Sequence, residues 1–261
     1  MSGIITLTTD FGPSSAYVAA MKGVILSINP AATIVDITHA IGAQDIRAGA
    51  LALEEATRWF PAETIHVAVV DPGVGTSRQI VYARIGVQQF VAPDNGLLSR
   101  LALTTPPSTI ISVSEPAWWL SPVSRTFHGR DIMAPVAARL SLGLDPARLG
   151  PARHELTMLP WTEARVSDSK IEGAVQSIDS FGNLITDIPV DSLAKVPRDD
   201  ATTIFCDEHE TRGIFATYAD QPPMTFVAVL GSSGKLELAI VGESAADMLG
   251  IAVGTPVTIQ W

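Results

Sequence analysis

The sequence has little cysteine, few basic residues and no long apolar run, and each scarcity excludes a class of protein. The single cysteine, Cys206, excludes an internal disulfide framework and a cysteine-based metal cluster. The 17 Lys and Arg residues are scattered among 27 Asp and Glu, so binding to nucleic acid is not expected. Apolar runs end within about ten residues, short of the ~20 that span a bilayer, and no signal peptide precedes Ile4. We therefore expect a soluble, cytoplasmic protein that does not associate with membranes.

The apolar pattern changes character along the 261 residues. Up to residue 150, β-branched runs such as 4–9 and 65–70 alternate with segments whose apolar residues recur every three or four positions, which predicts a mostly parallel sheet covered by helices. Beyond residue 168, short strand-like runs separated by Gly, Pro, Asn and Asp predict a smaller antiparallel β-barrel. The expected fold is α/β, with an N-terminal domain over 1–150, a linker over 151–168 and a C-terminal β-barrel domain over 169–261.

Histidines and acidic residues show no metal-binding spacing. No two histidines stand four apart on a predicted helix or in a His-x-His arrangement, so a catalytic metal is not expected. His66 lies within a predicted buried strand and His39 ends another, which favours structural roles for both. Asp45 and Asp131 each precede a helical pattern, and we expect both to be N-caps.

Polar residues follow several predicted strands. Asp71 directly follows the apolar run 65–70, and the glycine-rich loop after it can bring Arg78 back towards its carboxylate. Because strand ends of a parallel sheet share one edge, these side chains could converge. The alternative is turn and capping chemistry, which explains His128 poorly because histidine favours neither. The residues in question are Asp10, Gln44, Asp45, Asp71, Asn95 and His128.

These residues lie within motifs that resemble the S-adenosyl-L-methionine (SAM) hydroxide adenosyltransferase family, the adenosine-forming SAM hydrolases related to the fluorinase and chlorinase. The motifs occur in family order along nearly the whole chain, and together they are highly specific. They are Thr8–Gly12, Tyr17–Val18 with Met21–Ile25, Gln44–Ile46, Val69–Thr76 with Arg78, Pro93–Leu98, Phe127–Asp131 and Asp179–Thr186.

The resemblance implies hydrolysis of SAM to adenosine and L-methionine through attack at the ribose C5′ carbon. It also implies a homotrimer that binds SAM between the N-terminal domain of one subunit and the C-terminal domain of the next. Asp71, Arg78 and His128 match the set proposed to activate water, and which of Asp71 and His128 is the base stays open. Asp10 matches the residue that holds the ribose hydroxyls, and Phe127 matches one that packs beside the nucleoside. SAM would be the substrate, and no cofactor is expected.

The remaining binding residues are carried over in the same way. Gln44 would line the ribose side, where the halogenases carry tryptophan, and Asp179 would meet the methionine ammonium. Phe181 would stack, and Asn183 would bond to adenine. Further candidates are Asn95, the turn residues Ser232 and Ser233, which match a methionine carboxylate contact, and Val241, which stands where the family usually has Asn.

Two other functions compete with SAM hydrolysis. A SAM- or adenosine-binding protein with negligible turnover would keep the pocket, but binding alone would not require Asp71, Arg78 and His128 together. A SAM-dependent halogenase is disfavoured because those enzymes carry tyrosine where Asp71 stands, and a carboxylate there would repel a halide. The nucleoside product, adenosine or a 5′-halo derivative, discriminates among these functions.

Overall fold

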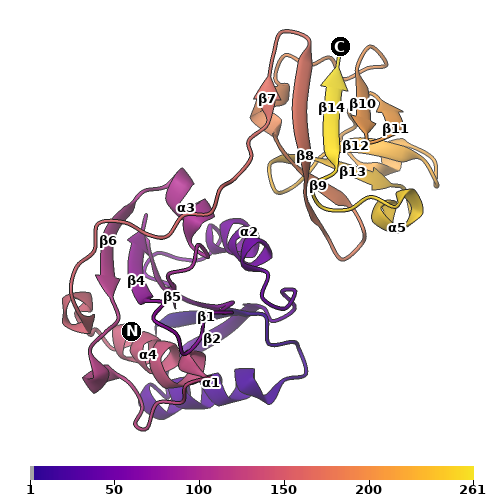
Figure 1. Ribbon diagram of the computed structural model, residues 1–261. Helices are drawn as coiled ribbons and strands as arrows, with labels where there is room; N and C mark the ends of the chain where they lie inside the picture. The colour runs from indigo at the N-terminus through magenta and orange to yellow at the C-terminus, as the bar shows by residue number, and fades with distance from the viewer. Residues whose placement is uncertain (1–2) are drawn as a thin grey trace. The chain divides into compact units, whose positions relative to one another are not determined.

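The computed structural model describes residues 3–261, and the chain divides into two compact units (Figure 1). The first ends at Pro160 and the second runs from Trp161 to Trp261. Residues 151–160 run along the first unit, where Arg153 N donates to Ile110 O (2.8 Å) and Thr157 N donates to Asp94 Oδ1 (2.8 Å). Among residues 3–261, none of the helices combines the length and apolar character needed to cross a bilayer.

The first unit is a six-stranded sheet with helices on both faces. Its strands are β1 (Ile4–Thr9), β2 (Thr33–Thr38), β3 (Ile65–Val69), β4 (Ile80–Ile85), β5 (Gln88–Pro93) and β6 (Pro107–Ser112). Its helices are α1 (Ala16–Ile28), α2 (Ile46–Thr57), α3 (Ser99–Thr104) and α4 (Ala134–Ser141), with a π-helical turn over Gly129–Met133 and 3₁₀ turns over Pro116–Trp118 and Pro146–Leu149.

The strand order is β2-β1-β3-β5-β4-β6, in which β2, β1, β3 and β5 run parallel. β4 is antiparallel to both neighbours, and the β4–β5 hairpin turns at Gly86, as the sequence predicted. After β1 the chain forms β2 on one side of β1, whereas after β3 it forms β4 and β5 on the other side of β3. The sheet therefore has a topological switch point between β1 and β3, where α/β proteins typically bind ligands.

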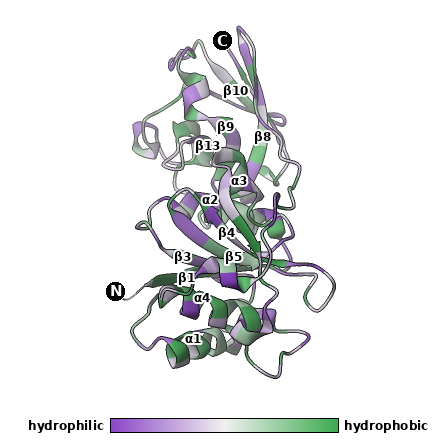
Figure 2. Cartoon of the chain, turned by 90° about the vertical axis from the view of Figure 1, so that its left-hand side faces the viewer, coloured by the Kyte–Doolittle hydropathy of each residue, from purple (hydrophilic) through white to green (hydrophobic). Residues whose placement is uncertain are grey.

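Apolar residues spaced for helices fill the layers above and below the sheet. α1 packs with α4 on one face, where Val18, Met21 and Ile25 join the buried faces of β1 and β3. α2 and α3 cover the other face, where Leu53 packs with Leu97 (Figures 1 and 2). The predicted cap of α2 is confirmed, because Asp45 Oδ1 accepts from Ala48 N at 2.9 Å.

The prediction that Asp131 caps a helix is wrong. Asp131 lies inside the π-helical turn, and its buried carboxylate accepts from Ser124 N (2.8 Å) and from the Arg130 side chain (2.6 Å). α4 begins only at Ala134, with Pro135 in its first turn. Asp131 therefore ties the π-turn to the preceding loop.

The second unit is an antiparallel, barrel-like sheet. Its strands are β7 (Arg165–Val166), β8 (Lys170–Ile178), β9 (Leu184–Pro189), β10 (Thr203–Cys206), β11 (His209–Arg212), β12 (Phe226–Leu230), β13 (Lys235–Ile240) and β14 (Pro256–Gln260). They pair in the order β11-β10-β14-β8-β9-β13-β12, and β7 pairs with β8. The two end strands meet where Thr211 Oγ1 donates to Phe226 O at 2.7 Å, which nearly closes the barrel. Short helices over Val190–Leu193, Tyr218–Asp220 and α5 (Ala245–Leu249) connect the strands.

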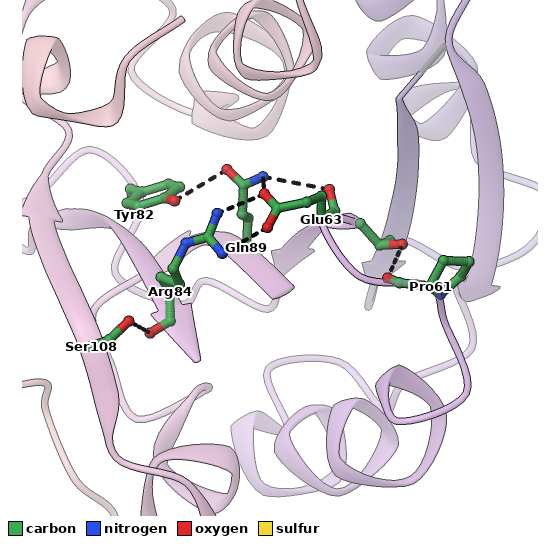
Figure 3. Close-up of polar contacts among 7 residues, drawn as sticks. Pro61, Glu63, Tyr82, Arg84, Gln89 and Ser108 are labelled. Atoms are coloured by element: carbon green, nitrogen blue, oxygen red, sulfur yellow. Dashed lines mark hydrogen bonds and ion pairs between the residues drawn. The ribbon is translucent and has the colours of Figure 1, made fainter. Parts of the chain in front are cut away.

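A polar network lies at the amino-terminal edge of the first sheet (Figure 3). Arg84 of β4 donates to both carboxylate oxygens of Glu63, which precedes β3, at 2.8 and 2.6 Å. Gln89 of β5 donates to the same carboxylate at 3.1 Å and accepts from the Tyr82 hydroxyl at 3.1 Å. The network fastens the loop before β3 to the β4–β5 hairpin.

Candidate active site

Three predicted site residues lie at the carboxyl-terminal edge of the first sheet. Asp10 follows β1 and Asp71 closely follows β3, so the two flank the switch point. Asp10 Oδ2 accepts from the backbone N–H of Gln44 at 2.8 Å, which joins the loops after β1 and β2. Asn95, after β5, donates its amide to Val70 O (2.9 Å) and accepts from Leu97 N (3.2 Å). The Asn95 side chain therefore fastens the end of β3.

Arg78 connects Asp71 to His128. Its Nε donates to Asp71 Oδ1 at 2.8 Å, and its Nη2 donates to Asp71 Oδ2 in the second arm of a bidentate pair. The same Nη2 lies 2.9 Å from His128 Nδ1. The Asp71 and Arg78 side chains are only 4% and 11% exposed, so water screens this pair weakly. The three predicted catalytic residues are thus brought together.

Glycines set the geometry of this cluster. Gly75 has φ +77°, and a Cβ there would lie 2.2 Å from the carbonyl oxygen of Arg125. Only glycine allows the loop after Asp71 to fold back against the segment that leads to His128. Gly129, next to His128, packs closely against Met21 and Val69. A Cβ on Gly129 would lie 3.3 Å from Met21 Sδ and 3.4 Å from Val69 Cγ1. The histidine is therefore held beside the end of β3.

The contact with Arg78 defines the protonation state of His128. A guanidinium group can only donate hydrogen bonds, so Nδ1 must accept and the proton of the neutral ring resides on Nε2. Burial, followed by the nearby charge of Arg78, lowers the pKa of His128 below its usual value, which favours the neutral ring. His128 therefore presents an N–H group on the side away from Arg78.

An aromatic cluster lies next to these residues. Phe127 packs edge-on against Phe11 (5.7 Å between centroids) and Tyr17 (5.0 Å), and the Arg130 guanidinium lies 4.9 Å from its centroid. Phe11 and Tyr17 are not among the predicted binding residues. Both belong to the motifs that carry the resemblance, and their aromatic character was the available signal. Together the three rings offer an apolar wall beside His128.

His66 and His39 make the structural hydrogen bonds that the sequence predicted. His66 Nδ1 lies 2.7 Å from Thr6 Oγ1 in the buried sheet, and burial lowers the pKa of His66 to about 4. His39 Nδ1 lies 2.9 Å from Thr9 Oγ1. Within residues 3–261, no group of three or more His, Cys, Asp or Glu side chains is arranged to hold a metal ion.

The second unit has a cavity of about 670 Å³. Four binding residues predicted for this unit line it: Asp179, Phe181, Asn183 and Ser232. Phe181 is 77% exposed, which leaves its ring available for stacking. Ser233 is not among the lining residues, and Val241 packs instead with a small apolar cluster around Val227.

The loop between β8 and β9 shapes one wall of this cavity. Asp179 Oδ1 accepts from the backbone N–H groups of Phe181 and Asn183, and Oδ2 accepts from Asn183 Nδ2, each at 2.9 Å. Gly182 has φ +82°, and a Cβ there would lie 2.0 Å from Ser244 Oγ. Tyr218, Glu237 and Glu243 also line the cavity and were not predicted.

Comparison with known proteins places the chain in a family. Residues 5–150 match the model of the SAM hydroxide adenosyltransferase N-terminal domain, and residues 173–258 match that of the C-terminal domain. A Salinispora tropica protein named (R)-S-adenosyl-L-methionine hydrolase is 36% identical over 96% of this chain and 95% of its own length. A Thermus thermophilus protein of the same name is 38% identical over 96% of this chain and 97% of its own. The crystal structure of an uncharacterized conserved protein from Thermotoga maritima superposes with a TM-score of 0.94 and 35% identity, covering 98% of this chain and all of that one. The chain belongs to the SAM hydroxide adenosyltransferase family.

Proposed function

We propose that this protein hydrolyses SAM to adenosine and L-methionine by attack of water on the ribose C5′ carbon. The observation that carries the proposal is the nearly buried Asp71–Arg78–His128 cluster at the carboxyl edge of the sheet. The names of the relatives and the family membership support the same reaction.

The reaction requires an activated nucleophile more than an acid. The leaving group is a neutral thioether, so as the water oxygen bonds to C5′, the electron pair of the C5′–S bond neutralises the sulfonium. The water must lose a proton, and a positioned base contributes about 10²–10⁴-fold to such a step.

We assign the base to Asp71. The neutral His128 carries its proton on Nε2, so that nitrogen can donate to the water oxygen but cannot accept from it. The Asp71 carboxylate accepts the proton, and the Arg78 cation stabilises the negative charge that develops on the water oxygen.

The substrate contacts follow the family pattern. Asp10 would hold the ribose hydroxyls, with Gln44 beside the ribose and Phe127 beside the nucleoside. Phe181 and Asn183 would recognise adenine, in a homotrimer whose sites are shared between neighbouring subunits. No residue role proposed here needs a metal or a cofactor.

Incubation with SAM tests the proposal directly. The relatives' name specifies the R configuration, so each sulfonium epimer is supplied separately, and the products are identified by chromatography and mass spectrometry. Release of equimolar adenosine and methionine is expected. Calorimetric binding of SAM without any adenosine would instead indicate a binding protein, and a 5′-halo nucleoside formed with chloride or fluoride would indicate a halogenase.

A shared site can be tested by mixing inactive variants. Asp71→Asn and Asn183→Ala change residues of different units of the chain. If neighbouring subunits share each site, co-refolded mixtures regain activity, because some sites combine two unchanged halves. If each site belongs to one subunit, no mixture regains activity.

A further inference from the structure

The turn after β1 carries Asp10, which is expected to hold the ribose hydroxyls. Its Oδ2 accepts from the backbone N–H of Gln44 at 2.8 Å, and Gln44 has a left-handed backbone (φ +65°) that is uncommon outside glycine. Within residues 3–261, Asp10 Oδ1 has no hydrogen-bond partner, which leaves it available to a ligand. The direction in which Oδ1 points therefore depends on the Gln44 contact and on the backbone of residues 9–12.

A buried hydroxyl fixes the beginning of this turn. Thr9, the last residue of β1, is 0% exposed, and its Oγ1 accepts from Phe11 N at 3.2 Å across Asp10. The same oxygen lies 2.9 Å from His39 Nδ1. A hydroxyl group has one donor and two acceptor sites, so Thr9 can bond to the Phe11 N–H and to either tautomer of the imidazole at once. Thr9 therefore connects the Asp10 turn to His39.

His39 also contacts the turn on the other side of Asp10. It follows β2, the strand that pairs in parallel with β1, and its carbonyl oxygen accepts from Gly12 N at 2.8 Å. The imidazole thus acts through Thr9, which precedes Asp10, and the carbonyl acts on Gly12, which follows it. Together the two contacts hold the backbone on both sides of Asp10.

Charged residues hold the imidazole in place. His39 Nε2 lies 3.1 Å from Asp36 Oδ1, an electrostatic contact without the alignment of a good hydrogen bond. Asp36 Oδ2 accepts from Lys22 Nζ of α1 at 2.5 Å. The His39 side chain is 10% exposed, so its neighbours confine the ring. These contacts therefore link α1 to the Asp10 turn.

The carboxylate of Asp36, the imidazole of His39 and the hydroxyl of Thr9 follow one another in the order of a nucleophilic triad. A nucleophile must reach its substrate, however, whereas the Thr9 hydroxyl is fully buried and already accepts from Phe11 N. Thr9 therefore cannot attack a ligand, and the arrangement serves to position the turn.

We propose that Thr9 and His39 are positioning residues, which orient the Asp10 carboxylate so that it accepts from the ribose hydroxyls of the substrate. This proposal rests on the proposed function. Neither residue needs to touch the substrate, because both act through the backbone on either side of Asp10. They therefore contribute only to the binding of ligands that carry the hydroxyls.

β1 also supplies a matched control. Thr6 is as buried as Thr9, and its Oγ1 lies 2.7 Å from a histidine nitrogen, His66 Nδ1. Thr9→Val and Thr6→Val each remove a buried hydroxyl from β1 and leave a histidine without its threonine partner. Of the two hydroxyls, only that of Thr9 contacts the Asp10 turn, so the variants separate positioning of Asp10 from a general loss of stability.

Two nucleosides measure the contribution of the hydroxyls. Adenosine carries both ribose hydroxyls, and 2′,3′-dideoxyadenosine lacks them. Calorimetry compares the Kd of each nucleoside for the full-length wild type, Thr9→Val, Thr6→Val and Thr9→Ser, which keeps the hydroxyl. Asp10→Ala shows how much of the preference for adenosine depends on the carboxylate.

Thr9→Val is expected to weaken adenosine binding about 2- to 10-fold, the range for one uncharged hydrogen bond, and to leave 2′,3′-dideoxyadenosine binding unchanged. Thr9→Ser should bind both nucleosides as the wild type does, and Thr6→Val should weaken neither. His39→Ala removes the imidazole but keeps the carbonyl that contacts Gly12, so it should reproduce the effect of Thr9→Val and covers the case in which that variant does not fold. Equal weakening of both nucleosides, no weakening, or a preference for adenosine that survives in Asp10→Ala would overturn the proposal.

Wild-type turnover keeps the two proposals distinguishable. If the wild type releases adenosine from SAM but Thr9→Val and His39→Ala keep its preference for adenosine over the dideoxynucleoside, the positioning role fails and the proposed function stands. If both variants lose that preference but the wild type releases no adenosine from SAM, the hydrolase function fails and the positioning role stands. A wild type that shows neither turnover nor the preference contradicts both.

Discussion

Two bidentate arginine–carboxylate pairs lie at opposite edges of the same sheet, and their settings differ. The Asp71–Arg78 pair lies at the carboxyl edge beside the switch point, with side chains 4% and 11% exposed and His128 attached. The Glu63–Arg84 pair lies at the amino edge, with side chains 60% and 33% exposed and partners that hold the strands together (Figure 3). The pairing itself is therefore no sign of catalysis. Low exposure, a histidine and the strand ends that α/β proteins use for ligands distinguish the first pair.

Neutralising each carboxylate in turn should produce the largest difference in kcat between the two pairs. Asp71→Asn keeps the shape of the side chain but removes the proposed base, so we expect kcat to fall about 10²–10⁴-fold. Glu63→Gln, the matched change at the other edge, should leave kcat within about twofold, because Glu63 lies at the opposite edge of the sheet from Asp71. Steady-state assays of adenosine release measure both. Equal losses in the two variants would remove the distinction between the pairs.

The two arginines should differ when each becomes lysine. Arg78→Lys keeps the charge but cannot contact Asp71 twice and His128 at once, so a loss of about 10–10²-fold in kcat/KM is expected. Arg84→Lys should leave kcat/KM unchanged and lower the free energy of unfolding by less than about 1 kcal/mol. Steady-state kinetics and urea unfolding measure both effects. A larger loss of kcat/KM in Arg84→Lys than in Arg78→Lys would contradict the assignment of Arg78 to the active site.

The pH dependence of kcat/KM should reveal the titration of His128, which contacts only the Asp71–Arg78 pair of the two. Burial and the Arg78 charge lower the pKa of His128, so most rings should still be neutral at pH 6.5, the usual midpoint for histidine, and kcat/KM should fall only at lower pH. Protonation would place a second cation against Arg78 and abolish the acceptor at Nδ1. His128→Asn should remove this acidic limb from the profile, whereas Glu63→Gln should preserve it. A midpoint at or above 6.5 would argue against the neutral histidine.

The smallest expected difference between the two pairs is in how their coupling free energies depend on salt concentration. Double-mutant cycles on the free energy of unfolding should give about 0–1 kcal/mol for Glu63 with Arg84, vanishing at high ionic strength. The hydrogen bond to Arg84 lowers the pKa of Glu63, so this contribution is present above the unfolded pKa and is lost as the pH falls. The coupling of Asp71 with Arg78 should persist in salt because both side chains are nearly buried.

Local patterns predicted much of the fold. The β-branched run 65–70, the spacing of Val18, Met21 and Ile25, and the cap at Asp45 all report interactions within a few residues, and all are confirmed. The π-helical turn was missed because its cause is not local periodicity. From the sequence the Asp131 side chain resembles a helix cap, but in the structure its carboxylate accepts a hydrogen bond from Ser124 N in the preceding loop.

Some residues of the two sites could be predicted from the sequence and others could not. Strand-end position and the glycine-rich loop led to Asp71 and Arg78, and His128 stood out as a poor turn residue. The contact of Tyr218 with Glu237 joins residues 19 apart from different elements, and no spacing encodes it. The available signal was a glutamate between Leu236 and Leu238, in a strand that is otherwise apolar from Leu236 to Ile240, because a carboxylate is rarely placed in such a position without a partner.

The source of the 5′-oxygen atom in adenosine shows whether water is the nucleophile. SAM is incubated with the enzyme in ¹⁸O-labelled water containing chloride, and both products are analysed by mass spectrometry. Attack of water on C5′ predicts one ¹⁸O atom in the 5′-hydroxyl of adenosine, unlabelled methionine and no chlorinated nucleoside. Adenosine without the label, or 5′-chloro-5′-deoxyadenosine in its place, would contradict it.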